Sequence, residues 1–319
     1  MPIHRLRRPI LSIPFIRPIS LMLVVLSSSG QLNAVDDDAD ARMIRLSAEA
    51  DAGYDTNPTL GSHQAARQIH GDPDSFGQAA AGARITVPVI PLVLSGRIDD
   101  REYAHQEALD HTLIHSAAEV PLSIHETTLA PRFYVNDDWY GDAYYSTTTH
   151  GALRWTQDWS REWSSDLTPF MEHTSYRPPF RAQDGTETGA SVSVTWWLPN
   201  LSPLRSLSLE VGGSRYKARA YVNTYSEGRV EVEQAYELPW KLACEMDLSW
   251  LPTHYNEPVA NGRENRRDHL FEGNVMVKRP IGAGFSAKLA CMITNNQSNR
   301  PAQQYHETEV SAGLVWEFR

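Results

Sequence analysis

Apolar and polar side chains alternate with period two along the chain from residue 44 onward, and helical spacing is almost absent. This is the pattern of a strand with one apolar and one polar face. In residues 44–54, Ile, Leu, Ala and Tyr occupy one face and mostly charged residues the other, and residues 309–318 alternate in the same way. The sequence therefore predicts an all-β fold.

The same alternation recurs twelve times between these two segments, which makes fourteen predicted strands. Most of them have roughly the 9 to 11 residues that a tilted strand needs to cross a bilayer. The twelve inner strands are predicted at residues 79–87, 92–102, 111–120, 124–136, 147–157, 164–174, 187–197, 205–215, 227–237, 240–250, 268–278 and 283–293.

The connections between the predicted strands alternate between short turns and long polar loops. The short turns are predicted at residues 88–91, 120–122, 159–162, 198–203, 238–239 and 279–280, and all but one contain proline, which cannot continue a ladder. The long loops are predicted at residues 55–77, 103–110, 137–146, 175–186, 216–226, 251–267 and 294–304. Short turns at one rim and long loops at the other are typical of a bacterial outer-membrane protein. We therefore predict a single transmembrane antiparallel up-and-down β-barrel of about 14 strands.

The two kinds of large aromatic residue separate by rim, which supports the barrel. Indole and phenol rings prefer the membrane interface. Nearly all tyrosines lie at the long-loop rim or in the loops. Tryptophans at or beside the short-turn rim are Trp155, Trp159, Trp163, Trp196, Trp197, Trp240 and Trp316. The alternative is a secreted β-sandwich with aromatic residues in its core, but a sandwich does not explain this separation.

The N-terminal residues predict export. Several arginines precede the short apolar run at residues 21–26, and small and polar residues follow up to Ala34. This is the pattern of a secretory signal peptide. We predict a signal peptide at residues 1–34, a short periplasmic lead-in at residues 35–43 and the barrel at residues 44–319, with the bacterial outer membrane as its location.

Composition and charge exclude several other classes. The chain has 29 Lys and Arg against 39 Asp and Glu, a net charge of −10. This balance argues against a nucleic-acid partner, which needs clustered basic residues. Its two cysteines cannot form a disulfide framework or a four-thiolate zinc site. No apolar run of 18 residues is present, so a helical membrane protein is excluded.

If the apolar face contacts lipid, the charged face lines a lumen, and its charges divide into two walls. The basic wall, on the second to sixth predicted strands, consists of Arg84, Arg97, Arg101, Arg132 and Arg154. The acidic wall, on the ninth to twelfth, consists of Glu210, Glu231, Glu233, Glu245, Asp247 and Glu272, and the closing fourteenth and first strands continue it with Glu307, Glu309, Glu49 and Asp51. Opposed walls would create a transverse field across a water-filled bore. Alternatively, these residues pair with neighbours and only maintain the shape of the barrel.

Residues for catalysis or metal binding give only weak signals. His105, His111 and His115 fall in one predicted hairpin, where a metal site is one interpretation and exposed histidines without a ligand the other. Residues 146–150 place hydroxyls beside the imidazole of His150 without an acid at a suitable spacing. We therefore expect no catalytic residues, no metal, no cofactor and no enzyme activity. A barrel hydrolase remains an alternative, because its catalytic residues could meet across strands.

Motifs at both ends of the predicted barrel resemble a known family. Residues 52–58 read Ala-Gly-Tyr-Asp-Thr-Asn-Pro. This is similar to the Gly-Tyr-Asp-Ser/Thr-Asn element that opens the barrels of surface lipoprotein assembly modifiers and related outer-membrane β-barrel porins. Residues 266–268, 295–299 and 310–318 resemble the last hairpins of that family. The resemblance implies a barrel of fourteen strands. Members also carry a helical-repeat domain before the barrel, whereas here only residues 35–43 separate the signal peptide from the first strand.

These observations predict an outer-membrane barrel that forms a transport channel for a solute or polymer. The alternative is a barrel module of a lipoprotein or polysaccharide surface-export system that works with a separate periplasmic partner, a helical-repeat protein. Other expected partners are outer-membrane lipid and the barrel assembly machinery, which would read the C-terminal alternation Leu314, Trp316 and Phe318.

Overall fold

A computed structural model of the chain describes residues 44–58, 72–87, 90–141, 143–198, 203–258 and 264–318. The predicted signal peptide (1–34), the lead-in (35–43) and Arg319 lie outside the described residues. No helix among the described residues is long and apolar enough to cross a membrane.

The described residues form a single sheet with five short 3-10 helices in its connections. The strands are β1 (Ile44–Asp55), β2 (Asp74–Val87), β3 (Leu92–Tyr103), β4 (His111–Glu119), β5 (Leu122–Ile124), β6 (Thr127–Tyr140), β7 (Ala143–Asp158), β8 (Trp163–Tyr176), β9 (Gly185–Trp197), β10 (Leu204–Ala218), β11 (Tyr225–Leu238), β12 (Leu242–Pro258), β13 (Asn265–Gly282), β14 (Phe285–Ser298) and β15 (Tyr305–Phe318). The helices are η1 (Glu107–Leu109), η2 (Phe180–Gln183), η3 (Tyr221–Asn223), η4 (Pro239–Lys241) and η5 (Pro301–Gln303).

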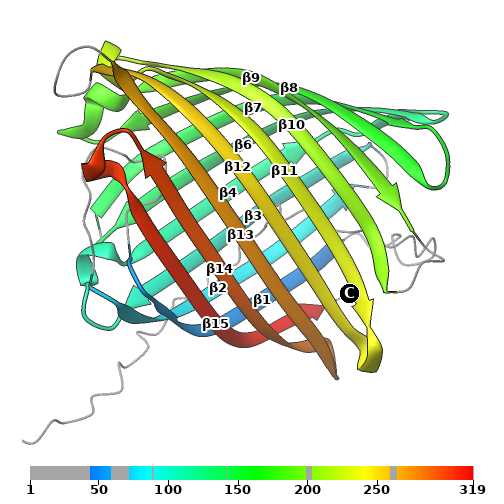
Figure 1. Ribbon diagram of the computed structural model, residues 1–319. Helices are drawn as coiled ribbons and strands as arrows, with labels where there is room; N and C mark the ends of the chain where they lie inside the picture. Colours follow the sequence, from blue (N-terminus) through cyan, green and yellow to red (C-terminus); the bar gives the residue numbers. More distant parts are fainter. Residues whose placement is uncertain are drawn as a thin grey trace, which may run out of the picture.

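The sheet closes into a barrel (Figure 1). Neighbouring strands pair antiparallel in sequence order, β1 pairs with β15, and β4 pairs with β6 as well as with β3. The short β5 continues β4 in the same register along β6, since Glu119 lies opposite Arg132 and Leu122 opposite Leu129. Counting β4 and β5 as one strand, the described residues form a closed barrel of fourteen strands. The predicted fold is therefore confirmed.

Two of the predicted turns are wrong, and backbone conformation explains both. The chain does not turn at residues 120–122 but continues past Pro121 to a turn at His125 and Glu126, where His125 has φ of 55°. It does not turn at residues 279–280 either, because β13 runs on to Gly282 and the turn follows at Ala283 and Gly284. Gly284 has φ of 80°, a conformation that glycine adopts without strain. Tight hairpins need such positions more than they need proline.

Most strands extend further into the predicted long loops than the alternation indicates. For example, β2 begins at Asp74 rather than at residue 79, and β12 ends at Pro258 rather than at residue 250. In these extensions polar residues occupy both faces. The part of a strand that lies outside the membrane needs no apolar face. The alternation of apolar and polar residues therefore stops before the strand ends.

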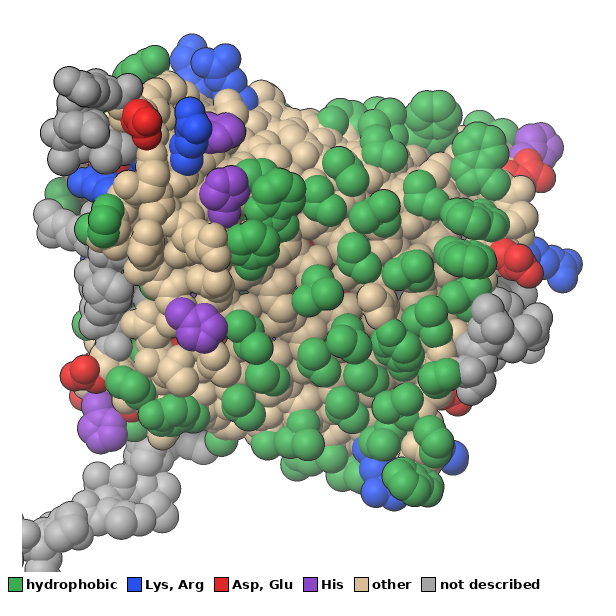
Figure 2. Space-filling model, viewed as in Figure 1, with side chains coloured by type: hydrophobic (Ala, Val, Ile, Leu, Met, Phe, Trp, Pro, Cys, Tyr) green, Lys and Arg blue, Asp and Glu red, His purple; other side chains and the backbone are tan. Residues whose placement is uncertain are grey.

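The outer wall of the barrel exposes a broad belt of apolar side chains (Figure 2). Closure satisfies the backbone within the sheet, as the hydrocarbon of a bilayer requires. An apolar belt of this extent around a closed barrel is a surface that lipid covers. The chain is therefore a β-barrel of the bacterial outer membrane. Exposed members of the belt are Leu94, Phe133, Leu153, Leu167, Met171, Val192, Val194, Leu209, Val211, Leu248, Phe271, Val275, Leu289, Ile293, Val310 and Leu314.

Tryptophans mark the short-turn end of this belt. Trp155, Trp159, Trp163, Trp196 and Trp240 are exposed there. The rings of Trp163 on β8 and Trp196 on β9 stack with their centroids 5.2 Å apart. Indole rings at this level match the aromatic girdle of outer-membrane barrels.

Gly313 is needed where β15 meets β1. It lies opposite Asp51 on β1 and opposite Lys288 on β14. A Cβ at this position would be 1.8 Å from Oδ1 of Asp51 and 2.2 Å from the carbonyl oxygen of Ala50, so a larger side chain forces the strands apart. We expect Gly313→Ala to lower the free energy of unfolding by about 1–3 kcal/mol. The folded barrel migrates differently from the heat-denatured chain in gels, so the denaturant concentration at which half of the folded band is lost measures this change. The control is Gly151→Ala on β7, where a Cβ meets nothing within 4 Å. Equal stability of the two variants would contradict this account.

Candidate functional site: the barrel lumen

Strand register places all residues of the two predicted walls at inward-facing positions. Arg84 lies on the same face of β2 as Gln78. The side chain of Gln78 accepts a hydrogen bond from Arg101 of β3 inside the lumen. Among the wall residues, Arg132, Arg154 and Glu210 line a cavity of about 850 Å³. The acidic residues of β11, β12 and β13 follow Glu210 at matching register positions.

Two arginines of the basic wall pair with acids on their own strand or on strands two or three places away in the sheet. Arg97 donates from Nε to Asp99 at 2.7 Å and from Nη2 to Glu49 of β1 at 3.4 Å. Arg101 donates from Nη1 to Glu309 of β15 at 2.8 Å. The contacts to Glu49 and Glu309 extend across two or three strands of the curved sheet, and both lie inside the barrel. For this part of the lumen, the interpretation of paired charges that maintain the barrel shape describes the contacts well.

The remaining arginines of the basic wall are less uniformly paired. Arg154 donates to Glu119 at 2.7 Å. The guanidinium of Arg132 lies 6.0 Å from the centroid of the Tyr134 ring. Arg84 lies opposite Arg45 on β1. The basic wall therefore carries much less net positive charge than its five arginines suggest.

On β10 to β13, the acidic wall lacks comparable compensation, whereas Glu49, Asp51 and Glu309 of β1 and β15 form ion pairs. Glu210 of β10 lies directly opposite Glu231 of β11, and Glu233 lies directly opposite Asp247 of β12. Among the described residues, the six carboxylates on these four strands have one ion pair, between Nε of Arg229 and Glu231 at 3.4 Å. Neutral donors are also present. The side-chain amide of Asn274 donates to Asp247 at 3.1 Å, and the hydroxyl of Ser249 donates to Glu272 at 3.4 Å.

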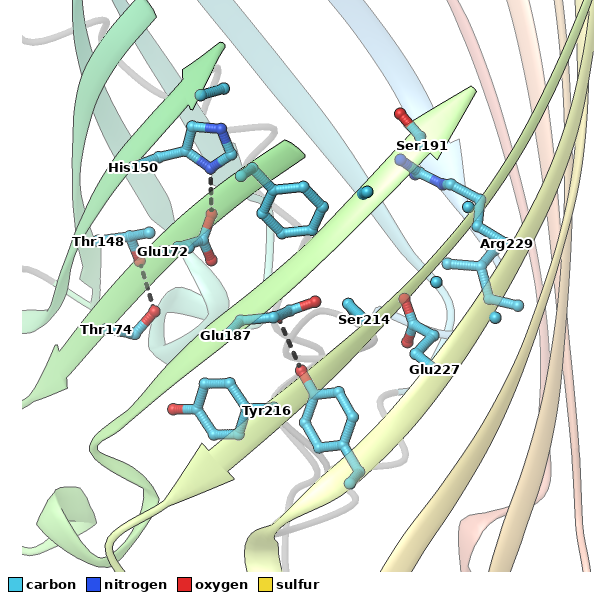
Figure 3. Close-up of a pocket in the computed structure, with 18 of the residues that line it drawn as sticks. Thr148, His150, Glu172, Thr174, Glu187, Ser191, Ser214, Tyr216, Glu227 and Arg229 are labelled. Carbon is cyan, nitrogen blue, oxygen red and sulfur yellow. Dashed lines mark hydrogen bonds and ion pairs between the residues drawn. The ribbon is translucent and has the colours of Figure 1, made fainter. Parts of the chain in front are cut away.

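This cavity of about 850 Å³ lies inside the barrel, beside the acidic residue Glu210 of β10. Side chains of β4 and of β6 to β13 line it, together with residues of η2, η3 and η5. Figure 3 shows Glu172, Glu187 and Glu227 among the polar side chains around this space, with Arg229 on its far side. The lumen is therefore hollow on this side and filled by ion pairs near β1.

Aromatic rings stack in two rows along the wall of this cavity. Tyr134 and His150 stack with centroids 4.2 Å apart, and Tyr216 and Tyr225 with centroids 5.0 Å apart. Tyr225 also packs on Tyr255, whose ring lies 4.1 Å from the guanidinium of Arg266. The hydroxyls bind carboxylates: that of Tyr134 donates to Glu172 at 3.1 Å, and that of Tyr225 donates to Glu187 at 3.5 Å.

These inward rings correct one expectation. The tyrosines were expected at the membrane interface of the long-loop rim, and Tyr134, Tyr216, Tyr225 and Tyr255 do lie toward that rim, but they line the lumen. The sequence holds a signal for this. Tyr134 has the parity of Arg132, and Tyr225 has the parity of Glu231, so each shares the face of a predicted lumen charge.

The histidine and serine candidates do not assemble into one site. The imidazole of His111 contacts Asp138 at 3.2 Å, that of His115 contacts Asn136 at 2.5 Å, and that of His105 contacts Asp74 at 2.9 Å. Within the described ranges, no group of three His, Cys, Asp or Glu residues is arranged to hold a metal ion.

The hydroxyl of Ser146 and the imidazole of His150 contact different residues. Ser146 donates to Asp138 at 3.1 Å, whereas His150 contacts Glu172 at 3.2 Å. These two residues share the inner face of β7 but form no serine–histidine pair.

No family model matches the chain, and no curated protein matches its sequence. Among solved structures, it is similar to OmpT, an outer membrane protein of Vibrio cholerae, at 8% identity, covering 88% of this chain and 99% of that one with a TM-score of 0.45. It is similar to an anion-selective porin from Comamonas acidovorans at 6% identity, covering 86% and 98%, with a TM-score of 0.45. It is also similar to a bacterial polysaccharide outer membrane secretin at 12% identity, covering 87% and 99%, with a TM-score of 0.43. The resemblance to surface lipoprotein assembly modifiers stays a prediction.

Proposed function

We propose that the barrel is a porin-like channel for small hydrophilic solutes that prefers cations to anions. The observation that carries this proposal is the acidic wall on β10 to β13, with one ion pair for six carboxylates, beside a cavity of about 850 Å³. Fixed carboxylates on a wall of low dielectric constant raise the local concentration of cations and exclude anions.

The pairing of the basic wall supports a lumen field dominated by the acidic wall. Opposed walls of equal strength would orient dipolar solutes without favouring either sign of ion. Because Arg97, Arg101 and Arg154 contact acids, their field is weakened at its source. The field of the acidic wall then dominates, and the lumen acts as a negative potential well rather than as a balanced transverse dipole.

Conductance of the purified, refolded protein in planar bilayers tests the proposal. We expect stepwise currents, and in a tenfold KCl gradient a reversal potential with the sign of potassium selectivity. Heat-denatured protein in the same detergent is the control and should give no steps. A folded protein that gives no current, or a reversal potential with the sign of chloride selectivity, would refute the proposal.

A second candidate function is a barrel module of a surface-export system with a periplasmic helical-repeat partner. The favouring observation is that the family-like motifs secure the first strand and the last strands of the barrel. Asp55 is fully buried and accepts hydrogen bonds from the backbone of Asn57 at 2.9 Å and the hydroxyl of Tyr103 at 3.3 Å. Arg266 pairs with Asp268, which accepts from Ser298 at 2.6 Å.

Cross-linking in intact cells, followed by purification of the barrel, separates the two candidates. A helical-repeat protein recovered in stoichiometric amount would support the export module. Transient recovery of the barrel assembly machinery is expected in either case, since Trp316 and Phe318 form the aromatic end of the last strand. A barrel recovered alone that conducts ions would leave the channel as the function.

A further inference from the structure

The outer face of β8 carries a serine, a histidine and a contact to a threonine of β9. The hydroxyl of Ser175 lies 3.2 Å from Nε2 of His173. Nδ1 of the same imidazole lies 3.0 Å from Oγ1 of Thr186. His173 and Thr186 are direct partners in the β8–β9 register. His173 and Ser175 are both exposed, so a substrate could reach the hydroxyl from outside the barrel.

This cluster lies where the apolar belt ends. On the outer row of β8, the exposed Leu167 and Met171 precede His173 and Ser175, and on β9 the exposed Val192 lies on the same outer face as Thr186. Strand side chains alternate between faces, so residues of one parity share the outer wall. The row changes from lipid-facing to polar between Met171 and His173. Ser175 is therefore placed near the boundary between acyl chains and polar headgroups.

The geometry is that of a nucleophile, its general base and a group that orients the base. If Thr186 Oγ1 accepts the Nδ1 hydrogen, the imidazole keeps its Nε2 lone pair for the hydroxyl of Ser175. A serine hydroxyl that donates to such an imidazole becomes nucleophilic as its proton is transferred. The contacts thus assign a role to each side chain: Ser175 as nucleophile, His173 as base, and Thr186 as a positioning residue.

We propose that this cluster is a serine esterase site that cleaves acyl esters of membrane phospholipids. The substrate class follows from location, because the ester carbonyls of a phospholipid lie at the boundary between headgroups and acyl chains. Met171, with 60% of its surface exposed directly below His173 on the outer row, offers a contact for the acyl chain. The proposal goes beyond the channel, and it departs from the expectation that the chain is not an enzyme.

The reaction needs only the lipid and water. Oγ of Ser175 bonds to the ester carbonyl carbon while its proton passes to Nε2 of His173. The bond from carbon to the glycerol oxygen then breaks, and the imidazolium gives its proton to that oxygen, which releases lysophospholipid and leaves an acyl-serine. Water attacks the acyl-serine by the same path, with His173 as base, and a fatty acid leaves.

Vesicles of phosphatidylethanolamine and phosphatidylglycerol that contain the purified full-length protein test the proposal. We expect fatty acid and lysophospholipid to appear with the wild type, and the rate to fall at least about 100-fold in Ser175→Ala and in His173→Ala. We also expect a fluorophosphonate probe to attach to Ser175, identified by mass spectrometry. Thr186→Ala should lose part of the rate and Thr186→Ser should restore it, which a merely structural threonine would not predict.

The matched control is Ser116→Ala. Ser116 is an exposed serine on the outer face of β4, and its cross-strand partners are Gly96 and Val135 rather than a histidine. This variant should hydrolyse lipid at the wild-type rate. Heat-modifiable mobility confirms that each variant is folded. Wild type that neither hydrolyses lipid nor takes the probe, or a folded Ser175→Ala that keeps either property, overturns the proposal. Neither result bears on conductance, because the site faces outward and the channel lies inside.

Discussion

Neutralising the centre of the acidic wall is expected to remove most of the cation preference of the channel. The triple variant Glu231→Gln, Glu233→Gln and Asp247→Asn takes away three adjacent charges on β11 and β12, one pair of which lies directly opposite in register. The net charge of this part of the wall becomes less negative by three, and Arg229 loses its ion-pair partner Glu231. We expect the ratio of potassium to chloride permeability to fall several-fold toward one, measured from the reversal potential in a KCl gradient.

Salt concentration and a matched variant make this test specific. The Debye length is about 30 Å at 0.01 M and about 3 Å at 1 M, so the difference from wild type should be large in dilute KCl and small in concentrated KCl. The control variant Glu126→Gln, Asp158→Asn and Glu162→Gln removes the same number of charges from exposed positions in the short turns. A shift of equal size in both variants, or wild-type selectivity in the wall variant, would contradict the role of the acidic wall.

The face of each lumen residue could be predicted from the sequence, but its partner could not. Alternation alone places Arg97 and Glu231 on the polar face, which the strand register sets toward the lumen. Whether a charge is neutralised depends on the register between strands far apart in sequence, such as β3 and β1, where Arg97 contacts Glu49. Single-strand patterns carry no such register, so the imbalance between the two walls emerges only from the closed barrel.

Missing register also explains why the contacts of His173 and Ser175 could not be predicted from the sequence. His173 and Ser175 are two residues apart, and the alternation of β8 places them on one face. Nothing in that spacing shows that Thr186 lies beside the imidazole, because the contact requires the β8–β9 pairing. The prediction of turns failed for a different reason. The hairpins at His125 and Gly284 depend on residues with positive φ, whereas the prolines that suggested turns lie within or beside extended strands.

Lys288→Met is expected to be the most destabilising single substitution in the lumen. Lys288 of β14 reaches over Gly313 of β15 to Glu49 and Asp51 of β1, with Nζ 2.5 Å from Oδ2 of Asp51. Only 10% of the lysine side chain and 3% of that of Asp51 are exposed. Methionine keeps the volume but leaves the buried carboxylate of Asp51 without its cation and Glu49 with only the contact to Arg97, and breaking a buried ion pair costs about 3–5 kcal/mol.

Denaturant midpoints of the heat-modifiable band measure this loss, and a second substitution identifies its cause. In the background of Lys288→Met, the changes Glu49→Gln and Asp51→Asn remove the uncompensated charges and should recover much of the lost stability. Lys278→Met is the control, since Lys278 lies opposite Lys288 in register and forms no ion pair among the described residues. If Lys278→Met costs as much as Lys288→Met, or if neutralising the two acids recovers nothing, then the ion pairs at the β14–β15–β1 junction do not stabilise the closed barrel. The geometry predicts the opposite, because Gly313 leaves space for the carboxylate of Asp51, which Lys288 contacts at the point where the sheet closes.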